Sequence, residues 1–316
     1  MSEKEYKPLE GRQFPRFSGL KTFFRLPVAD VKDAFDVALF GVPFDGGASY
    51  RVGQRFAPQM VRAASSLGRG YHWGRDVHFS NELRVADVGD APTVPIDLEQ
   101  TYERVEKFAD DILKTKKKFI SCGGDHSTTL PLLRALHKHY KKPLGLIHFD
   151  AHFDTYPPAW NKEYHHGTFV RHAVTEKLID PTKTVQIGIR GPFAVKDDAA
   201  FAEKNKFTVW NMDLIRARGV EALCSQWPDF GDMPVYLSFD VDSLDPAFAP
   251  GTGTPVIGGL TSYEAQSFLR RLPPVNLVGA DVVEVIPQYD PSEITQLFAV
   301  DVMFEILCHM AGHKRG

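Results

Sequence analysis

Leu144-Gly145-Leu146-Ile147-His148-Phe149-Asp150-Ala151-His152-Phe153-Asp154 joins a short apolar run to a group of acids and histidines. The run at 144–149 is apolar almost throughout and does not alternate, which is typical of a strand covered on both faces. Helical patterns alternate with further runs of this kind along the chain. This order predicts an α/β fold with three layers, α/β/α, and a mainly parallel central sheet. The predicted strands are 36–44, 118–121, 144–149, 184–189, 207–211, 235–239 and 276–285, and the clearest helices are 98–115, 128–140, 262–272 and 293–310.

Length and composition narrow the possible classes. The 316 residues fit one α/β unit, which we expect over residues 36–316 after an N-terminal extension at 1–35. Lys and Arg number 37 against 40 Asp and Glu, a net charge of −3, without the basic excess of a nucleic-acid binder. The first 35 residues lack the apolar core of a secretory signal, and we expect no transmembrane helix. We therefore expect a cytoplasmic protein with neither a nucleic acid nor a membrane as partner.

Polar residues follow four of the predicted strands. Asp125 and His126 follow the strand at 118–121, and Asp150 begins the group after 144–149. Asp240 follows the strand at 235–239, and the run from 276 reaches Glu284. Ligands of parallel sheets bind at the carboxyl ends of the strands, and residues two apart on an extended segment project from one side. The sequence therefore predicts one crowded site at this rim.

So many carboxylates would repel one another, and a bound cation would compensate them. Oxygen and imidazole donors without a thiolate favour manganese. Taken singly, an Asp at a strand end is usually a helix cap and a lone His a core residue, but here the pattern repeats on successive strands. Six donors exceed one four-coordinate site and indicate a bridged pair of ions that would acidify a water for attack on carbon or phosphorus. The donors are His126, Asp150, His152, Asp154, Asp240 and Asp242.

Three motifs resemble the signatures of the ureohydrolases, the arginase and agmatinase family. The likeness runs from about residue 37 to 308, and the stretch 246–255 particularly resembles the agmatinase branch. The motifs are Gly123-Gly124-Asp125-His126-Ser127, Asp150-Ala151-His152-Phe153-Asp154-Thr155 and Ser238-Phe239-Asp240-Val241-Asp242-Ser243-Leu244-Asp245-Pro246.

The resemblance implies two Mn²⁺ ions per subunit on an arginase-like α/β/α fold, hydrolysis of a guanidinium group to urea and an amine, and a homo-oligomer, either a trimer or a hexamer. Glu284 would pair with the guanidinium, and His166, next to Gly167, would shuttle protons or steady the substrate. Asp245 would assist the leaving amino group or, as an alternative, simply open a turn before Pro246. One ion would be held by His126, Asp150, Asp154 and Asp240, and the other by Asp150, His152, Asp240 and Asp242.

Two residues in or near the second motif differ from the usual residues of the family and bear on which substrate tail the site accepts. Arginases commonly carry Asn two positions after its last Asp, where this chain has Tyr156. Free arginine is therefore disfavoured, and agmatine, cleaved to putrescine, is the first expectation. Phe153 replaces the usual Ser or Thr, and alternation turns it away from the ligands. The alternatives are a guanidino-acid hydrolase acting on 4-guanidinobutyrate or 3-guanidinopropionate, a metal phosphoesterase, and a silent regulatory homologue.

Overall fold

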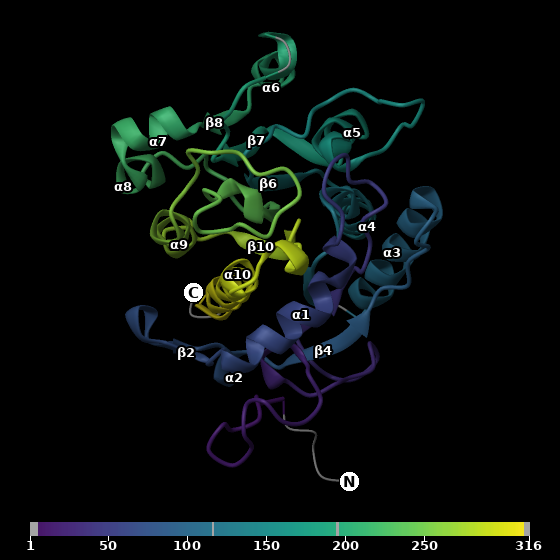
Figure 1. Cartoon of the computed structure of the whole chain (residues 1–316), viewed down its shortest axis with the longest axis vertical. Helices are drawn as coiled ribbons and strands as arrows, with labels where there is room; N and C mark the ends of the chain where they lie inside the picture. The colour runs from purple at the N-terminus through teal and green to yellow at the C-terminus, as the bar shows by residue number, and fades with distance from the viewer. Residues whose placement is uncertain (1–5, 116, 194–195, 313–316) are drawn as a thin grey trace.

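The central sheet has eight strands in the order β4-β1-β5-β10-β9-β6-β7-β8, and every neighbouring pair is parallel (Figure 1). The computed structural model describes residues 6–115, 117–193 and 196–312. Helices cover the sheet on both sides, so the predicted α/β/α class is confirmed. The strands are β1 (Val37–Gly41), β4 (Val85–Asp90), β5 (Lys118–Cys122), β6 (Leu144–Phe149), β7 (Ile179–Ile187), β8 (Thr208–Trp210), β9 (Pro234–Asp240) and β10 (Asn276–Val283).

Alternate side chains of each strand enter two separate cores. On β6, for example, Ile147 and Phe149 belong to one core while Leu144 and Leu146 belong to the other. The first core is closed by α1 (Ala57–Ala64), α7 (Met212–Arg218), α8 (Val220–Cys224), α9 (Ser262–Arg270) and α10 (Ile294–Gly312). The second is closed by α3 (Leu98–Leu113), α4 (Thr129–Tyr140) and α5 (Phe169–Thr175). Burial on both faces explains why these strands are apolar throughout.

Two strands of the central sheet, β4 and β7, depart most from the prediction. β4 was not predicted, because only its first half is buried and its Gly89 and Asp90 face outward at the edge of the sheet. β7 begins at Ile179, well before the predicted 184, and its pairing with β6 shifts register between Leu144 and Leu146. Residues 180–183 of β7 include Pro181, which cannot donate a ladder hydrogen bond. The sequence pattern therefore did not predict the first part of this strand.

The expectation about membrane helices needs one correction. α10 is 19 residues long, and its apolar window is long and hydrophobic enough to cross a membrane by length and composition alone. In the fold, 78% of this window is buried, and the helix packs against α1, α9 and β10 (Figure 1). A core helix surrounded by protein needs the same apolar composition as a membrane-spanning one.

The segment before β1 packs on the domain. Phe23 is buried, its N–H donates to Oδ2 of Asp87 at 2.9 Å, and the guanidinium of Arg62 lies 4.4 Å from the centre of its ring. Arg62 in turn donates to Asp87 and to Asp90 at the end of β4. This segment contains the short η1 (Phe23–Arg25), and a small antiparallel pair, β2 (Tyr71–His72) and β3 (Val77–His78), lies between β1 and β4 in sequence. Residues 1–5 and 313–316 of the two predicted ranges lie outside the described residues.

The strands that carry the predicted polar residues are neighbours at the centre of the sheet. β5, β10, β9 and β6 follow one another in that order, although β10 is the last strand of the chain. Their carboxyl ends therefore meet at one place on the rim, which is where parallel sheets generally bind their ligands.

Candidate metal centre

A sharp turn after β5 brings His126 to the rim. Gly123 and Gly124 have φ of +84° and +88°, a left-handed conformation that glycine adopts without strain. A Cβ atom on Gly124 would lie 2.8 Å from the carbonyl oxygen of Val42, so only glycine fits there. Oδ1 of Asp125 then accepts the N–H of Ser127 and caps the short helix that begins at His126. The glycines of this motif thus serve to place the imidazole.

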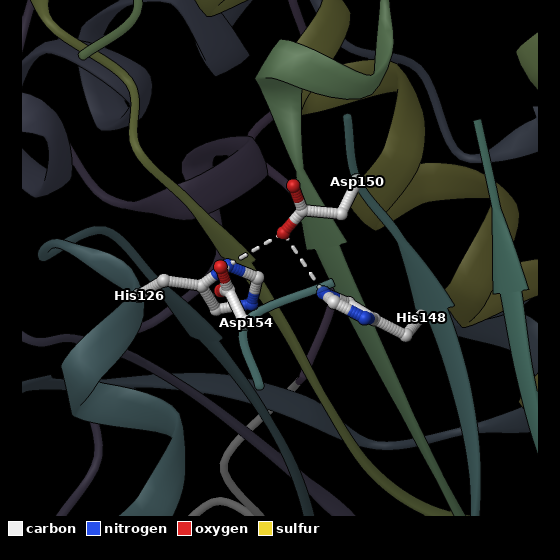
Figure 2. Close-up of side chains that lie close together, drawn as sticks. All are labelled: His126, His148, Asp150 and Asp154. Atoms are coloured by element: carbon white, nitrogen blue, oxygen red, sulfur yellow. Dashed lines mark hydrogen bonds and ion pairs between the residues drawn. The ribbon is translucent and has the colours of Figure 1, made fainter. Parts of the chain in front are cut away.

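Nδ1 of His126 lies among three carboxylates. It is 3.0 Å from Oδ2 of Asp150, 3.0 Å from Oδ2 of Asp154 and 3.2 Å from Oδ2 of Asp240. Figure 2 shows the first two of these acids pointing toward the imidazole. Nδ1 is buried and forms no hydrogen bond of good geometry. A buried imidazole nitrogen surrounded by several carboxylate oxygens is a set of donors suited to a metal ion.

A second group of donors lies beside the first and shares one member with it. Nδ1 of His152 lies 3.0 Å from Oδ2 of Asp242 and 3.2 Å from Oδ1 of Asp150. The donor atoms of Asp150, His152 and Asp242 lie within 4.8 Å of one another, as do those of the group that contains His126, Asp150 and Asp154. The two oxygens of Asp150 thus face different groups. This is the arrangement expected when one carboxylate bridges two ions.

The carboxylates of the cluster repel one another, and a positive charge would relieve this repulsion. Burial, with repulsion from Asp242 and Asp150, raises the pKa of Asp240 well above its ordinary value. Burial and the charge of Asp150 likewise raise the pKa of Asp242. Divalent cations would compensate these carboxylates, and the oxygen and imidazole donors fit such ions. The His152 side chain is 24% exposed and the carboxylates 7% or less, so solvent reaches the centre at His152.

His148 belongs to this cluster although the sequence analysis passed over it (Figure 2). The amide nitrogen of Gln186 donates both to the carbonyl of Phe153 and to Nδ1 of His148, each at 2.9 Å. Nε2 of His148 therefore carries the hydrogen and donates to Oδ2 of Asp150 at 2.9 Å. This geometry makes His148 a support for Asp150. Its position two residues before Asp150, on the same side of the strand, was the signal that could have found it.

Glu284 lies immediately after β10 and is fully buried. Its Oε1 accepts the N–H of His126 at 2.9 Å and lies 3.1 Å from Nδ1 of His166, while Oε2 accepts Nε2 of Gln54 at 2.7 Å. Burial alone would lower the pKa of His166. The hydrogen bond to Glu284 and the negative charge of Glu284 outweigh burial and raise this pKa to about 9. Contact with His166 also lowers the pKa of Glu284 despite its burial. Glu284 and His166 thus form an ion pair beside the carboxylate cluster.

Gln54 and Ser49 were also not predicted, since neither lies in one of the three motifs. Nε2 of His166 lies 2.7 Å from Oγ of Ser49, on the exposed side of the imidazole. The neighbouring His165 makes different contacts. The His165 ring instead accepts the N–H of Gly167, from its position as the cap of the short helix that begins at His166.

Asp245 does not join the cluster. Its Oδ1 accepts the N–H of Ala247 at 3.0 Å, and its Oδ2 accepts the N–H groups of Gly258 and Gly259. These bonds form the turn that the sequence left as an alternative, and both carboxylate oxygens of Asp245 accept backbone N–H groups. Phe153 does turn away from the ligands, as expected. Its ring packs with Ile189 and Ala202 and lies 5.6 Å from that of Phe193.

With this geometry established, comparison with known proteins gives the family. The family model for "Arginase family" matches residues 35–309. The chain belongs to the arginase family. Members of the arginase family are hydrolases of guanidino compounds that depend on a binuclear metal centre, and the described residues contain the corresponding cluster of His and Asp. The resemblance to the ureohydrolase family is therefore confirmed, and the chain is an enzyme.

Within the arginase family, similar relatives have different names. The chain is 47% identical over 313 residues to "Guanidinopropionase" of Pseudomonas aeruginosa, covering 98% of each chain. It is 46% identical over 278 residues to "Agmatinase" of Photorhabdus laumondii, covering 87% of each. The solved structure of proclavaminate amidino hydrolase from Streptomyces clavuligerus superposes with a TM-score of 0.89 at 40% identity, covering 94% of this chain and 99% of that one.

Proposed function

We propose that the protein is a manganese-dependent ureohydrolase that cleaves a guanidino compound to urea and an amine. The observation that carries the proposal is that two groups of metal donors share Asp150 and lie directly beside the buried ion pair of Glu284 and His166. Two divalent ions held there would compensate the carboxylates and acidify a water molecule. The carboxylate next to them would pair with a planar cation such as guanidinium.

The proposed ligands follow the two donor groups. His126, Asp150, Asp154 and Asp240 would hold one ion, and Asp150, His152, Asp240 and Asp242 the other. The distances that support this assignment are those of His126 and His152 to their surrounding carboxylates. Imidazole with carboxylate and no thiolate favours manganese over zinc or magnesium.

Glu284 and His166 would act on the substrate. A carboxylate offers about four acceptor positions, and three contacts already occupy the oxygens of Glu284. One position remains for a guanidinium N–H, and a bidentate pairing requires that His166 release Oε1. The released imidazole would then be free to give a proton to the leaving amine, and Ser49 would connect its Nε2 to solvent.

Agmatine, cleaved to putrescine, is the first substrate that we propose, because the stretch 246–255 resembles the agmatinase branch and Tyr156 stands where arginases commonly carry Asn. The second candidate is 3-guanidinopropionate, which the similarity to guanidinopropionase over 98% of both chains supports. The two molecules carry tails of opposite charge, an ammonium and a carboxylate. A direct comparison therefore discriminates sharply between them.

The test is urea release by manganese-loaded protein from agmatine, 3-guanidinopropionate, 4-guanidinobutyrate and arginine, with p-nitrophenyl phosphate as a control for phosphoesterase chemistry. We expect the highest kcat/KM with agmatine. Preference for either guanidino acid would replace agmatine and leave the reaction class intact. Absence of urea from all four compounds would overturn the proposal.

We further propose a cytoplasmic homo-oligomer, either a trimer or a hexamer, without nucleic acid or membrane as partner. Light scattering coupled to size-exclusion chromatography should give three or six times the 35.4 kDa of one chain. A mass of 35.4 kDa would contradict it.

A further inference from the structure

Asp281 is a buried acid that the proposed mechanism does not use. It lies on β10 and is 1% exposed. Three hydroxyl groups converge on its carboxylate: Ser238 donates to Oδ1 at 2.6 Å, and Tyr236 and Thr129 each donate to Oδ2 at 2.7 Å. No lysine or arginine pairs with Asp281 in the part of the chain that the structure describes. A carboxylate in such a position is costly to bury, which suggests that it has a function.

One of the three hydroxyls also contacts the candidate metal centre. Oγ of Ser238 lies 2.8 Å from Nε2 of His126, on the side of the imidazole opposite to the three carboxylates. Asp281, Ser238 and His126 thus form a continuous chain of hydrogen bonds. It starts on β10, crosses β9 and ends at Nδ1, the nitrogen that faces Asp150, Asp154 and Asp240.

Asp281 determines which group donates and which accepts in each of these hydrogen bonds. The single hydrogen of the Ser238 hydroxyl is donated to Oδ1 of Asp281. Ser238 can then only accept from His126, and Nε2 must carry the hydrogen. With the hydrogen on Nε2, the lone pair of Nδ1 is directed at the three carboxylates. Without the acceptor at Asp281, the hydroxyl could donate to Nε2 instead, and the hydrogen would move to Nδ1 and block the metal position.

We propose that Asp281 is a positioning residue that acts through Ser238 to hold His126 in the tautomer that binds the metal ion. Such outer partners fix the orientation and tautomer of a ligating imidazole and raise its affinity for metal. The inference rests on the metal centre of the proposed function. Under this proposal Asp281 affects the ion held by His126 and not the ion held by His152 and Asp242, since those two residues do not contact these hydrogen bonds.

The test measures Mn²⁺ binding by the full chain, after removal of metal, for wild type, Ser238→Ala and Asp281→Leu, which removes the acceptor and approximately keeps the side-chain volume. Titration calorimetry gives affinity and stoichiometry, and electron paramagnetic resonance distinguishes a coupled pair of ions from a single one. We expect both variants to bind the ion at His126 about 10- to 100-fold more weakly. At limiting Mn²⁺ they should show the spectrum of a single ion. Ser238→Thr keeps the hydroxyl and should restore the pair.

Tyr236→Phe is the matched control. It removes a different donor to Asp281 but leaves Ser238 and His126 in place, so it should lower the melting temperature of the metal-free protein without weakening Mn²⁺ binding. If Asp281→Leu is poorly folded, Ser238→Ala carries the same test. Equal Mn²⁺ binding by wild type and Ser238→Ala would overturn the role of Asp281. Failure of the wild type itself to bind Mn²⁺ would instead overturn the metal centre.

Discussion

Asp154 and Glu284 share a backbone feature at the level of single residues. Their φ angles are +51° and +65°, in the left-handed region that non-glycine residues seldom adopt. Such a conformation costs on the order of 1 kcal/mol or more and persists only where the surroundings impose it. Each residue directs a carboxylate toward the same rim. Backbone strain is therefore present where the proposed chemistry takes place, although other described residues such as Lys141 and Lys206 also have positive φ.

Asp150→Asn tests the shared carboxylate. The amide replaces one of the two oxygens that face different donor groups, and it removes a negative charge. We expect loss of at least one Mn²⁺ per chain by elemental analysis and a fall in urea release of at least about 100-fold. Asp87→Asn, at a buried acid bound to Arg62, should lower stability and keep the metal. Full metal content in Asp150→Asn would refute the bridge.

Glu284→Gln tests the partner of the guanidinium. The substitution is nearly isosteric, but an amide –NH₂ would face either the N–H of His126 or the amide of Gln54. We expect retained Mn²⁺ and a kcat lower by about 10²- to 10³-fold in the urea assay. Glu305→Gln, a buried glutamate bound to Arg270 away from the centre, controls for general destabilisation. Unchanged kinetics in Glu284→Gln would contradict the assigned role.

The ion pair of His166 and Glu284 should appear in the pH dependence of stability. The pKa of His166 is raised from 6.5 to about 9, so its stabilising contribution is complete below pH 6.5 and is lost as the pH rises through about 9. In metal-free protein, the difference in unfolding free energy between wild type and His166→Asn should therefore shrink by roughly 1–3 kcal/mol across this range. Urea denaturation at several pH values measures it. The pKa of His165 is lowered, chiefly by burial, and His165→Asn should not show this decline. A constant difference for His166→Asn would exclude the pair.

At the scale of elements, the central strands and the long helices were predictable because burial on both faces and helical periodicity are visible in the residue types. β4 was not, because an edge strand buries only part of its length. His148 was missed because a single histidine inside an apolar run resembles a core residue. Its role depends on Gln186, which is 38 residues away in sequence and reaches His148 only because β6 and β7 pair. Gln54 and Ser49 depend on the same kind of contact between distant segments.

Gly124→Ala tests the turn that places His126. The new Cβ would meet both an unfavourable φ and the Val42 carbonyl oxygen at 2.8 Å. We expect a loss of about 2–4 kcal/mol in unfolding free energy, with weaker Mn²⁺ binding. Gly89→Ala is the matched control, since Gly89 has φ +82° but no atom within 4 Å of the position that a Cβ would take. It should cost only about 1 kcal/mol and leave Mn²⁺ binding unchanged. Equal losses in both variants would refute the steric argument.

At the scale of the whole molecule, the fold class and the convergence of four strand ends followed from the alternation of strands and helices. The order of strands did not, because nothing local in residues 276–283 indicates that β10 lies between β5 and β9. That order results from packing, since α10 after it must cover the same core as α1 and α9. The substrate tail is the least predictable property, because it depends on loop side chains around Tyr156 and not on the scaffold.

The central place of β10 affects how the protein is made. Until the last strand of the polypeptide has left the ribosome, β4-β1-β5 and β9-β6-β7-β8 are separate half-sheets, each with an unpaired inner edge. His126 belongs to one half, and Asp150 and Asp240 belong to the other. Because β10 lies between β5 and β9, the donor set is complete only when β10 is in place. A nonsense mutation before residue 276 would therefore leave aggregation-prone fragments with no partly active form, and a chaperone that shields those edges during translation would raise the yield of active enzyme.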